Sequence, residues 1–302
     1  MVLKKLRMLI TIVIVFCGLV PLLDGKRAEA QDVDINGESR KWNGTAWTHR
    51  PPLDRADSPS ARAFHAMAYD SFRNVTVLFG GDNSGYFGDT WEWDGSTWTD
   101  VSPGSGPSAR SGHAMAYDEN SNVIVLFGGY NDGGYLADTW TWDGINWSLI
   151  TTGSPSPRKR HALAYDVNSN VIVLFGGYYN DGTEHFYGDT WEWNGSTWTD
   201  VSPGSGPSAR MNPAMAYDAN SNVTVLFGGG DDDYTWKWDG STWTGVPPGS
   251  GPSARESPAM AYDANSNVIV LFGGCEPTTS SNETWEWDGA SWTNRPGRGP
   301  AA

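Results

Sequence analysis

Aromatic and acidic side chains gather in five stretches of this 302-residue chain, each of which follows a Gly-Gly pair. Tyrosine supplies rigid contact area at low entropic cost. An aromatic face beside a carboxylate stacks on a sugar ring and accepts hydrogen bonds from its hydroxyl groups. The stretches therefore predict a surface that binds a glycan or a protein, and packing of loops onto the scaffold is the alternative. The candidate binding residues are Tyr86, Phe87, Tyr130, Tyr135, Tyr178, Tyr179, Glu184, His185, Phe186, Tyr187, Asp231, Asp232, Asp233 and Tyr234.

Three histidines, His65, His113 and His161, recur at one place in a repeated pattern, where two further repeats have Pro213 and Pro258. Three imidazoles around one axis are an arrangement that binds metals. A repeated structural residue is the alternative interpretation, and we expect neither a metal nor a cofactor. Asp118-x-Asn120-x-Asn122 resembles the start of a calcium loop but lacks its later Gly and Glu, which favours an Asx turn.

The sequence contains no recognisable catalytic motif. We find no Ser-His-Asp or Cys-His constellation, phosphate-binding loop or dinucleotide fingerprint. A pair of carboxylates from different repeats remains an open alternative, because such a pair hydrolyses glycosides. We expect a protein that is not an enzyme.

Internal repeats explain most of the remaining chain. Residues 89–110 and 189–210 differ at one position in 22. The full unit reads R-x-x-[HP]-A-[ML]-A-Y-D, a short turn, V-x-V-L-F-G-G, a variable stretch, and W-x-W-[DN]-G-x-x-W. Its Gly pairs start at residues 80, 128, 176, 228 and 273, so the spacings are 48, 48, 52 and 45 residues.

Each unit contains four predicted strands. Residues 65–69 alternate large and small side chains, and residues 74–79 form a β-branched apolar run that ends at Gly80-Gly81. Trp91-Glu92-Trp93 places both indoles on one face, and Asp94-Gly95 is a hairpin turn before a fourth strand at Trp98. No stretch has a useful helical period. Four strands per unit of this length predict an all-β fold, a β-propeller.

The chain resembles the kelch-repeat family, including the kelch-type central domain of galactose-oxidase-like proteins. The motifs are the Gly-Gly pairs, the five Arg-x-x-[His/Pro] segments and a Trp in every fourth strand, over about residues 36–292. One departure is a Trp in the third strand, where the family usually has Tyr. The resemblance would imply copper radical chemistry on a Tyr–Cys cross-link, a second Tyr and two His. No such residue carries over, because Cys275 lies in a loop without Tyr, and this activity is disfavoured.

The units do not complete a ring. Five full units run over residues 62–292, and residues 40–47 match only the third and fourth strands of a unit. We favour six positions with an incomplete closing blade over five blades and a spare hairpin, and the chain as a fragment is a further possibility. An incomplete blade leaves strand edges that invite pairing, which makes assembly with another chain the alternative function.

The order of the antiparallel strands separates two ends of the propeller. Turns between the first and second strands and between the third and fourth strands meet at one end, which we call the turn face. The variable loops join the second and third strands, and they lie at the other end, the loop face. They contain 8, 9, 12, 5 and 9 residues. Loops that vary on a repeated scaffold are where binding usually occurs.

The net charge limits the class of partner, and the first thirty residues indicate where the protein is located. The net charge is −15, and 15 cations against 33 anions remain after residue 30, which argues against nucleic acid and anionic membranes as partners.

Residues 1–30 have the layout of a cleavable signal peptide ending at Ala28-Glu29-Ala30. We therefore expect a secreted or periplasmic protein without a membrane span after cleavage, whose partner is a glycan or an extracellular protein. Residues 31–35 are a short leader, and residues 36–302 form one propeller domain.

Overall fold

The computed structural model describes residues 40–42, 47–49, 58–276 and 280–297. The predicted signal peptide (1–30) and leader (31–35) lie outside the described residues. All regular structure in the described part is β-structure. No helix within it has the length and hydropathy required to cross a membrane.

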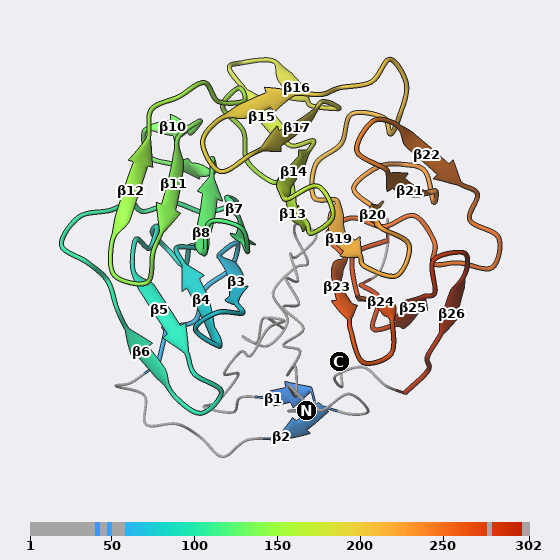
Figure 1. Ribbon diagram of the computed structural model, residues 1–302, viewed down its shortest axis with the longest axis horizontal. Helices are drawn as coiled ribbons and strands as arrows, with labels where there is room; N and C mark the ends of the chain where they lie inside the picture. Colours follow the sequence, from blue (N-terminus) through green and yellow to red (C-terminus); the bar gives the residue numbers. More distant parts are fainter. Residues whose placement is uncertain (1–39, 43–46, 50–57, 277–279, 298–302) are drawn as a thin grey trace.

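Five four-stranded antiparallel sheets form the blades of a propeller ring (Figure 1). Blade I contains β3 (Ala66–Asp70), β4 (Val75–Phe79), β5 (Thr90–Trp93) and β6 (Trp98–Asp100). Blade II contains β7 (Ala114–Asp118), β8 (Val123–Phe127), β11 (Thr139–Trp142) and β12 (Trp147–Ile150). Blade III contains β13 (Ala162–Asp166), β14 (Val171–Phe175), β17 (Thr190–Trp193) and β18 (Trp198–Asp200). Blade IV contains β19 (Ala214–Asp218), β20 (Val223–Phe227), β21 (Thr235–Trp238) and β22 (Trp243–Val246), and blade V contains β23 (Ala259–Asp263), β24 (Val268–Phe272), β25 (Thr284–Trp287) and β26 (Trp292–Asn294).

Three short hairpins stand outside the blades. Two lie in the variable loops of blades II and III, and the third precedes blade I. They are β9 (Tyr130–Asn131) with β10 (Gly134–Tyr135), β15 (Tyr178–Asn180) with β16 (Glu184–Phe186), and β1 (Arg40–Trp42) with β2 (Trp47–His49). The strand order and the all-β class confirm the predicted kelch-type propeller.

The turn after each first strand is held by its own aspartate. Asp118 Oδ1 accepts hydrogen bonds from the backbone N–H groups of Asn120 (3.0 Å) and Ser121 (3.1 Å). Asn122 then adopts a left-handed φ of 52°, which Asn tolerates better than most residues. The segment is therefore the predicted Asx turn, and its carboxylate is occupied by the backbone.

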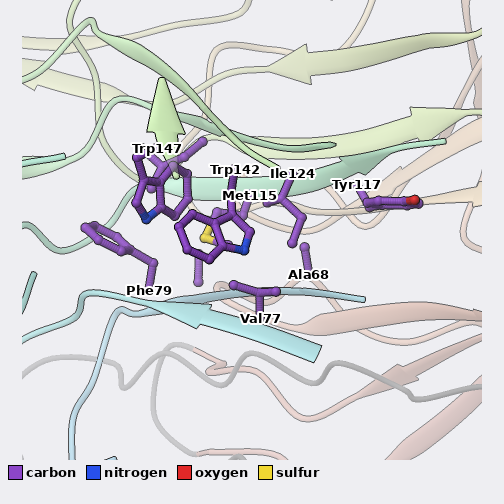
Figure 2. Close-up of a cluster of buried hydrophobic side chains, with 10 residues drawn as sticks. Ala68, Val77, Phe79, Met115, Tyr117, Ile124, Trp142 and Trp147 are labelled. Carbon is purple, nitrogen blue, oxygen red and sulfur yellow. The ribbon is translucent and has the colours of Figure 1, made fainter. Parts of the chain in front are cut away.

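The core lies between neighbouring blades. At the junction of blades I and II, Val77 and Phe79 pack against Met115, Trp142 and Trp147 (Figure 2). All five side chains are less than 9% exposed. Burial of apolar surface stabilises the fold by about 25 cal/mol per Å², so each stacked blade contributes to its neighbour's stability.

A chain of backbone hydrogen bonds circles the axis beside the first strands. The N–H of Gly112 donates to Phe64 O (2.8 Å), and that of Arg160 donates to Gly112 O (2.7 Å). The series continues through Asn212 N to Arg160 O (2.8 Å) and Ser257 N to Asn212 O (3.1 Å). It joins blades I to V in order. The β1–β2 hairpin is drawn between blades V and I (Figure 1).

The β1–β2 hairpin has the register of an outer pair of strands. Trp42 pairs with Trp47, as Trp93 pairs with Trp98 in blade I. This is the arrangement that an incomplete sixth blade requires.

Candidate binding surface

The arginine that begins each unit is the anchor of the loop face. The Arg158 guanidinium is fully buried and donates to Gly176 O (2.9 Å) and to both carboxylate oxygens of Asp189 (2.6 and 2.7 Å). Arg62 and Arg110 make the same bidentate contact with Asp89 and Asp138. Because the acid closes the variable loop of the same blade, the arginine fixes where that loop begins and ends.

The side chains of these arginines contact acids of their own blade. Their backbone makes a connection between blades. The N–H of Gly81 in blade I donates to Arg110 O in blade II (2.8 Å), and the N–H of Arg110 donates to Phe87 O (3.0 Å). Arg110 therefore holds its own blade together through its side chain and joins the preceding blade through its backbone.

Some predicted binding residues serve this anchor. The ring of Phe87 lies under the Arg62 guanidinium (4.1 Å to the centroid), and that of Tyr187 lies under Arg158 (4.0 Å). In blade IV, Asp232 pairs with Arg210 (2.6 Å) and so replaces the acid that other units place before the third strand. These three residues help to hold their arginines, because a partner charge or a ring beneath the guanidinium stabilises a buried arginine.

The remaining blade IV residues stand apart from the other candidates. Tyr234 packs its ring against Trp236 at 6.0 Å and is 39% exposed. Asp231 is exposed and Asp233 half-buried. Asp231, Asp233 and Tyr234 all lie in the variable loop of blade IV.

Six aromatic residues of blades I to III form one continuous patch, which we call the tyrosine cluster: Tyr86, Tyr130, Tyr135, Tyr178, Tyr179 and Phe186. Tyr130 contacts Tyr86 at 6.2 Å and Tyr135 at 4.8 Å between ring centroids. Tyr135 then contacts Tyr178 at 6.0 Å and Tyr179 at 5.0 Å. The planes of these pairs meet at 60–70°, an edge-to-face packing that holds the rings in fixed positions.

Lys159 lies at the centre of the tyrosine cluster. Its Nζ is 4.5 Å from the Tyr130 ring centroid, 5.3 Å from Tyr135 and 5.9 Å from Tyr178. Burial, and then the neighbouring charge of Arg160, lowers the pKa of Lys159. An ammonium over three rings is stabilised by cation–π attraction and ties blade III to blade II.

Lys159 was not among the predicted site residues, although a sequence signal identifies it. In blades I, II, III and V the residue after the arginine forms a backbone bridge with the residue after the Gly-Gly pair, as Lys159 does with Tyr178 and Ser111 with Tyr130. The two positions are therefore neighbours in space in these units. The unit with Lys after its arginine also has Tyr after its Gly-Gly pair, as does the unit before it.

Polar side chains rim the tyrosine cluster. Tyr178 donates its hydroxyl hydrogen bond to Glu184 (2.9 Å), and His185 Nε2 lies 3.2 Å from Asp181 Oδ1. Phe186, at the end of the same hairpin, is 44% exposed. The structure thus brings Tyr86, Tyr130, Tyr135, Tyr178, Tyr179, Glu184, His185 and Phe186 together on the loop face.

The three histidines immediately precede the first strands of blades I to III and line the axial cavity. His113 Nε2 lies 3.1 Å from Phe79 O of blade I, and its ring packs against the Phe79 ring at 5.5 Å. Burial, and then the adjacent arginine, lowers the pKa of His65 and of His161 to about 3 and holds the pKa of His113 well below its ordinary value. The neutral rings pack inside the ring of blades. No three His, Cys, Asp or Glu side chains of the described residues are grouped to hold a metal ion.

Cys275 is buried in blade V, with its Sγ 4.0 Å from Ser280 Oγ and its backbone paired with Glu256. The tyrosine cluster belongs to blades I to III, so the cysteine and the exposed tyrosines occupy different parts of the molecule.

A family model described as the KLHDC2/KLHL20/DRC7 Kelch-repeats domain matches residues 13–229, more than half of the chain. No curated protein matches the sequence.

Proposed function

The chain belongs to the kelch-repeat family, and we propose that it is an exported, non-enzymatic binding module that holds a partner protein on its tyrosine cluster. The observation that supports this proposal is the fixed edge-to-face array of Tyr130, Tyr135, Tyr178 and Tyr179 on the loop face. Rigid tyrosines lose little conformational entropy when a partner covers them. Kelch propellers in general act as protein-binding modules.

The geometry of the rings favours a protein over a glycan. A sugar stacks on an open aromatic face, whereas here Lys159 approaches the faces of Tyr130, Tyr135 and Tyr178. The ring edges and hydroxyl groups remain for the partner, in a patch with polar groups at its rim. Protein interfaces combine a rigid aromatic centre with such a rim.

Export is part of the proposal and rests on the layout of residues 1–30. Fractionation of cells that produce the full chain, followed by N-terminal sequencing of the product, tests it. We expect an extracytoplasmic protein that begins near Gln31. A product that retains Met1 inside the cell would remove export from the proposal.

Binding is tested by comparing matched variants of the exported protein on a solid support. The first is Tyr135→Ser with Tyr179→Ser. The control is Phe72→Ser with Ile145→Ser, which removes two exposed apolar side chains (74% and 73% exposed) from the turn face. Proteins captured from the host's extracytoplasmic fraction are identified by mass spectrometry.

We expect a partner that the wild type and the control retain and that the tyrosine variant loses by at least tenfold. A glycan array probed with the same three proteins covers the other ligand class. Array binding that depends on the tyrosines, without a captured protein, would replace the protein by a glycan. Equal capture by all three proteins would contradict the use of this surface.

A further inference from the structure

Five residues surround the axial cavity at its loop-face end, and we call them the axial ring. They stand two places after the arginine that begins each unit, and in blades I to V they are Phe64, Gly112, Arg160, Asn212 and Ser257. All five have a left-handed φ of 54–64°, and all five line the cavity. The backbone hydrogen bonds that circle the axis join them in order.

The axial ring differs in every unit, whereas the first strands that follow it repeat almost unchanged. Five residue types occupy its five places, while each first strand reads Ala, Met or Leu, Ala, Tyr and Asp. A left-handed backbone favours glycine, and Gly112 shows that glycine fits this place. Four units nevertheless have a side chain there, so the backbone conformation alone does not account for the residues. A position that varies on a repeated scaffold and faces one cavity is typical of a binding site.

Arg160 is the cation of the axial ring, and no acid of the described residues pairs with it. Its Nη1 lies 3.7 Å from Met211 Sδ, which is a weak acceptor, and its guanidinium carbon lies 5.2 Å from the centroid of the Phe64 ring. The other arginine side chains that the structure describes each pair with an Asp or Glu at 2.9 Å or less. They are Arg62, Arg73, Arg110, Arg158, Arg210, Arg255 and Arg295. Arg160 therefore has donors that a bound anion can use.

Two buried polar side chains stand beside Arg160 in the axial ring. Asn212 is 8% exposed and Ser257 is 5% exposed. Within the described part of the chain neither side chain makes a hydrogen bond, although the backbone of both belongs to the series that circles the axis. A buried amide or hydroxyl group without a partner is destabilising. A ligand in the cavity that accepts hydrogen bonds would satisfy both groups.

The axial cavity has the size and the walls to hold a small organic molecule. Its volume is about 230 Å³, and a cavity of about 150 Å³ is enough for benzene. Beyond the histidines and prolines its walls are the alanines of the first strands and an apolar set of Met67, Met115, Leu163, Met215 and Met260. Burial keeps the histidines neutral at pH 7. Among the described residues that line the cavity, Arg160 thus carries the only charge, in a chain whose net charge is −15.

We propose that the axial cavity binds a small monocarboxylate with an apolar body. The Arg160 guanidinium donates to both carboxylate oxygens, a pairing that its planar fork favours. The Asn212 amide and the Ser257 hydroxyl group donate to the same carboxylate, and the apolar body lies against the alanines and methionines. One negative charge matches the single cation of the cavity. This inference is independent of the tyrosine cluster, none of whose rings lines the cavity.

The test uses the full chain with benzoate as the probe, and benzamide as a probe of the same shape without the charge. Binding is followed by titration calorimetry and by NMR of methyl-labelled methionines. The site variant is Arg160→Asn, because Asn212 occupies the same place in blade IV. The control variant is Lys237→Thr, which removes a cation from β21, outside the cavity, and matches Thr141 of blade II.

We expect 1:1 binding of benzoate to the wild type and to the control variant, and binding to Arg160→Asn that is weaker by about tenfold or more. Both variants should keep the thermal midpoint of the wild type. Benzamide should bind the wild type more weakly than benzoate by about the same factor. The ring current of bound benzoate should shift the methyl signals of the methionines that line the cavity, Met67, Met115, Met215 and Met260.

Three results would overturn the proposal: no binding of benzoate at millimolar concentrations, equal binding of benzoate and benzamide, or equal losses in the two variants. Binding that leaves the four methyl signals unshifted would overturn it too, because the probe would then lie outside the cavity. Inorganic phosphate that binds through Arg160 and excludes benzoate would overturn it in favour of an inorganic anion.

Discussion

The indole of Trp147 in blade II donates a 2.9 Å hydrogen bond to Thr90 Oγ1 in blade I, across 57 residues of sequence. Both side chains are buried. The same pair recurs as Trp198 with Thr139, Trp243 with Thr190 and Trp292 with Thr235. One polar contact inside an apolar junction thus sets the register of each blade on the one before it.

Thr90→Val should destabilise the protein by about 1–3 kcal/mol, because the indole N–H of Trp147 would remain buried without an acceptor. The matched control is Thr284→Val, at the same place in blade V, where no indole binds the hydroxyl. It should be neutral or slightly stabilising. Urea unfolding measures both, and equal losses in the two variants would refute the role given to the Trp–Thr pair.

The buried arginines should depend strongly on their acids. Arg110 is fully buried, and its guanidinium, with the indole of Trp140, lowers the pKa of Asp138 against the opposing effect of burial. Asp138→Asn should cost about 3–5 kcal/mol, because it leaves a buried charge without its counter-charge. The exposed Asp181, which contacts His185 and the backbone N–H of Thr183 near the protein surface, provides the control, and Asp181→Asn should leave the unfolding midpoint unchanged. A midpoint for Asp138→Asn within error of wild type would contradict the anchor.

The fold should lose stability in mild acid. The pKa of His65 and of His161 is about 3 in the folded protein and about 6.5 in the unfolded chain, so the unfolded chain binds these protons first. Their contribution is complete above pH 6.5 and is lost as the pH falls toward 3. At pH 5 each histidine should cost about 2 kcal/mol relative to pH 7.

The variant that tests this is His161→Pro, because Pro213 and Pro258 occupy the same place in two other units. The free energy of unfolding, measured from pH 7 to pH 4.5, should fall less steeply in the variant. An identical slope would mean that His161 does not take up a proton on unfolding.

The sequence predicted the scaffold well because every unit repeats the same local signals. Gly-Gly pairs, Asx turns and paired tryptophans recur in register, so errors in one unit are corrected by the others. The observed strands begin within one residue of those expected, for example at Ala66 and Val75 in blade I.

The site was harder to predict because it depends on contacts between units. The variable loops were located, yet Phe87, Tyr187 and Asp232 belong to the arginine anchor. Lys159 was missed because its tyrosine partners come from two different loops. The contact of Lys159 with these tyrosines becomes evident once the structure shows that the residue after the arginine pairs with the residue after the Gly-Gly pair.

Site-directed photo-crosslinking tests the central claim most directly. A benzoylphenylalanine replaces Tyr135 in the tyrosine cluster or, as a control, Leu149, which is 50% exposed on the outer strand β12. Cells producing each full-length variant are irradiated, and adducts are identified by mass spectrometry. We predict one discrete protein adduct from position 135 and none from position 149. Adducts of the same kind from both positions, or none from position 135, would contradict a binding surface on the loop face.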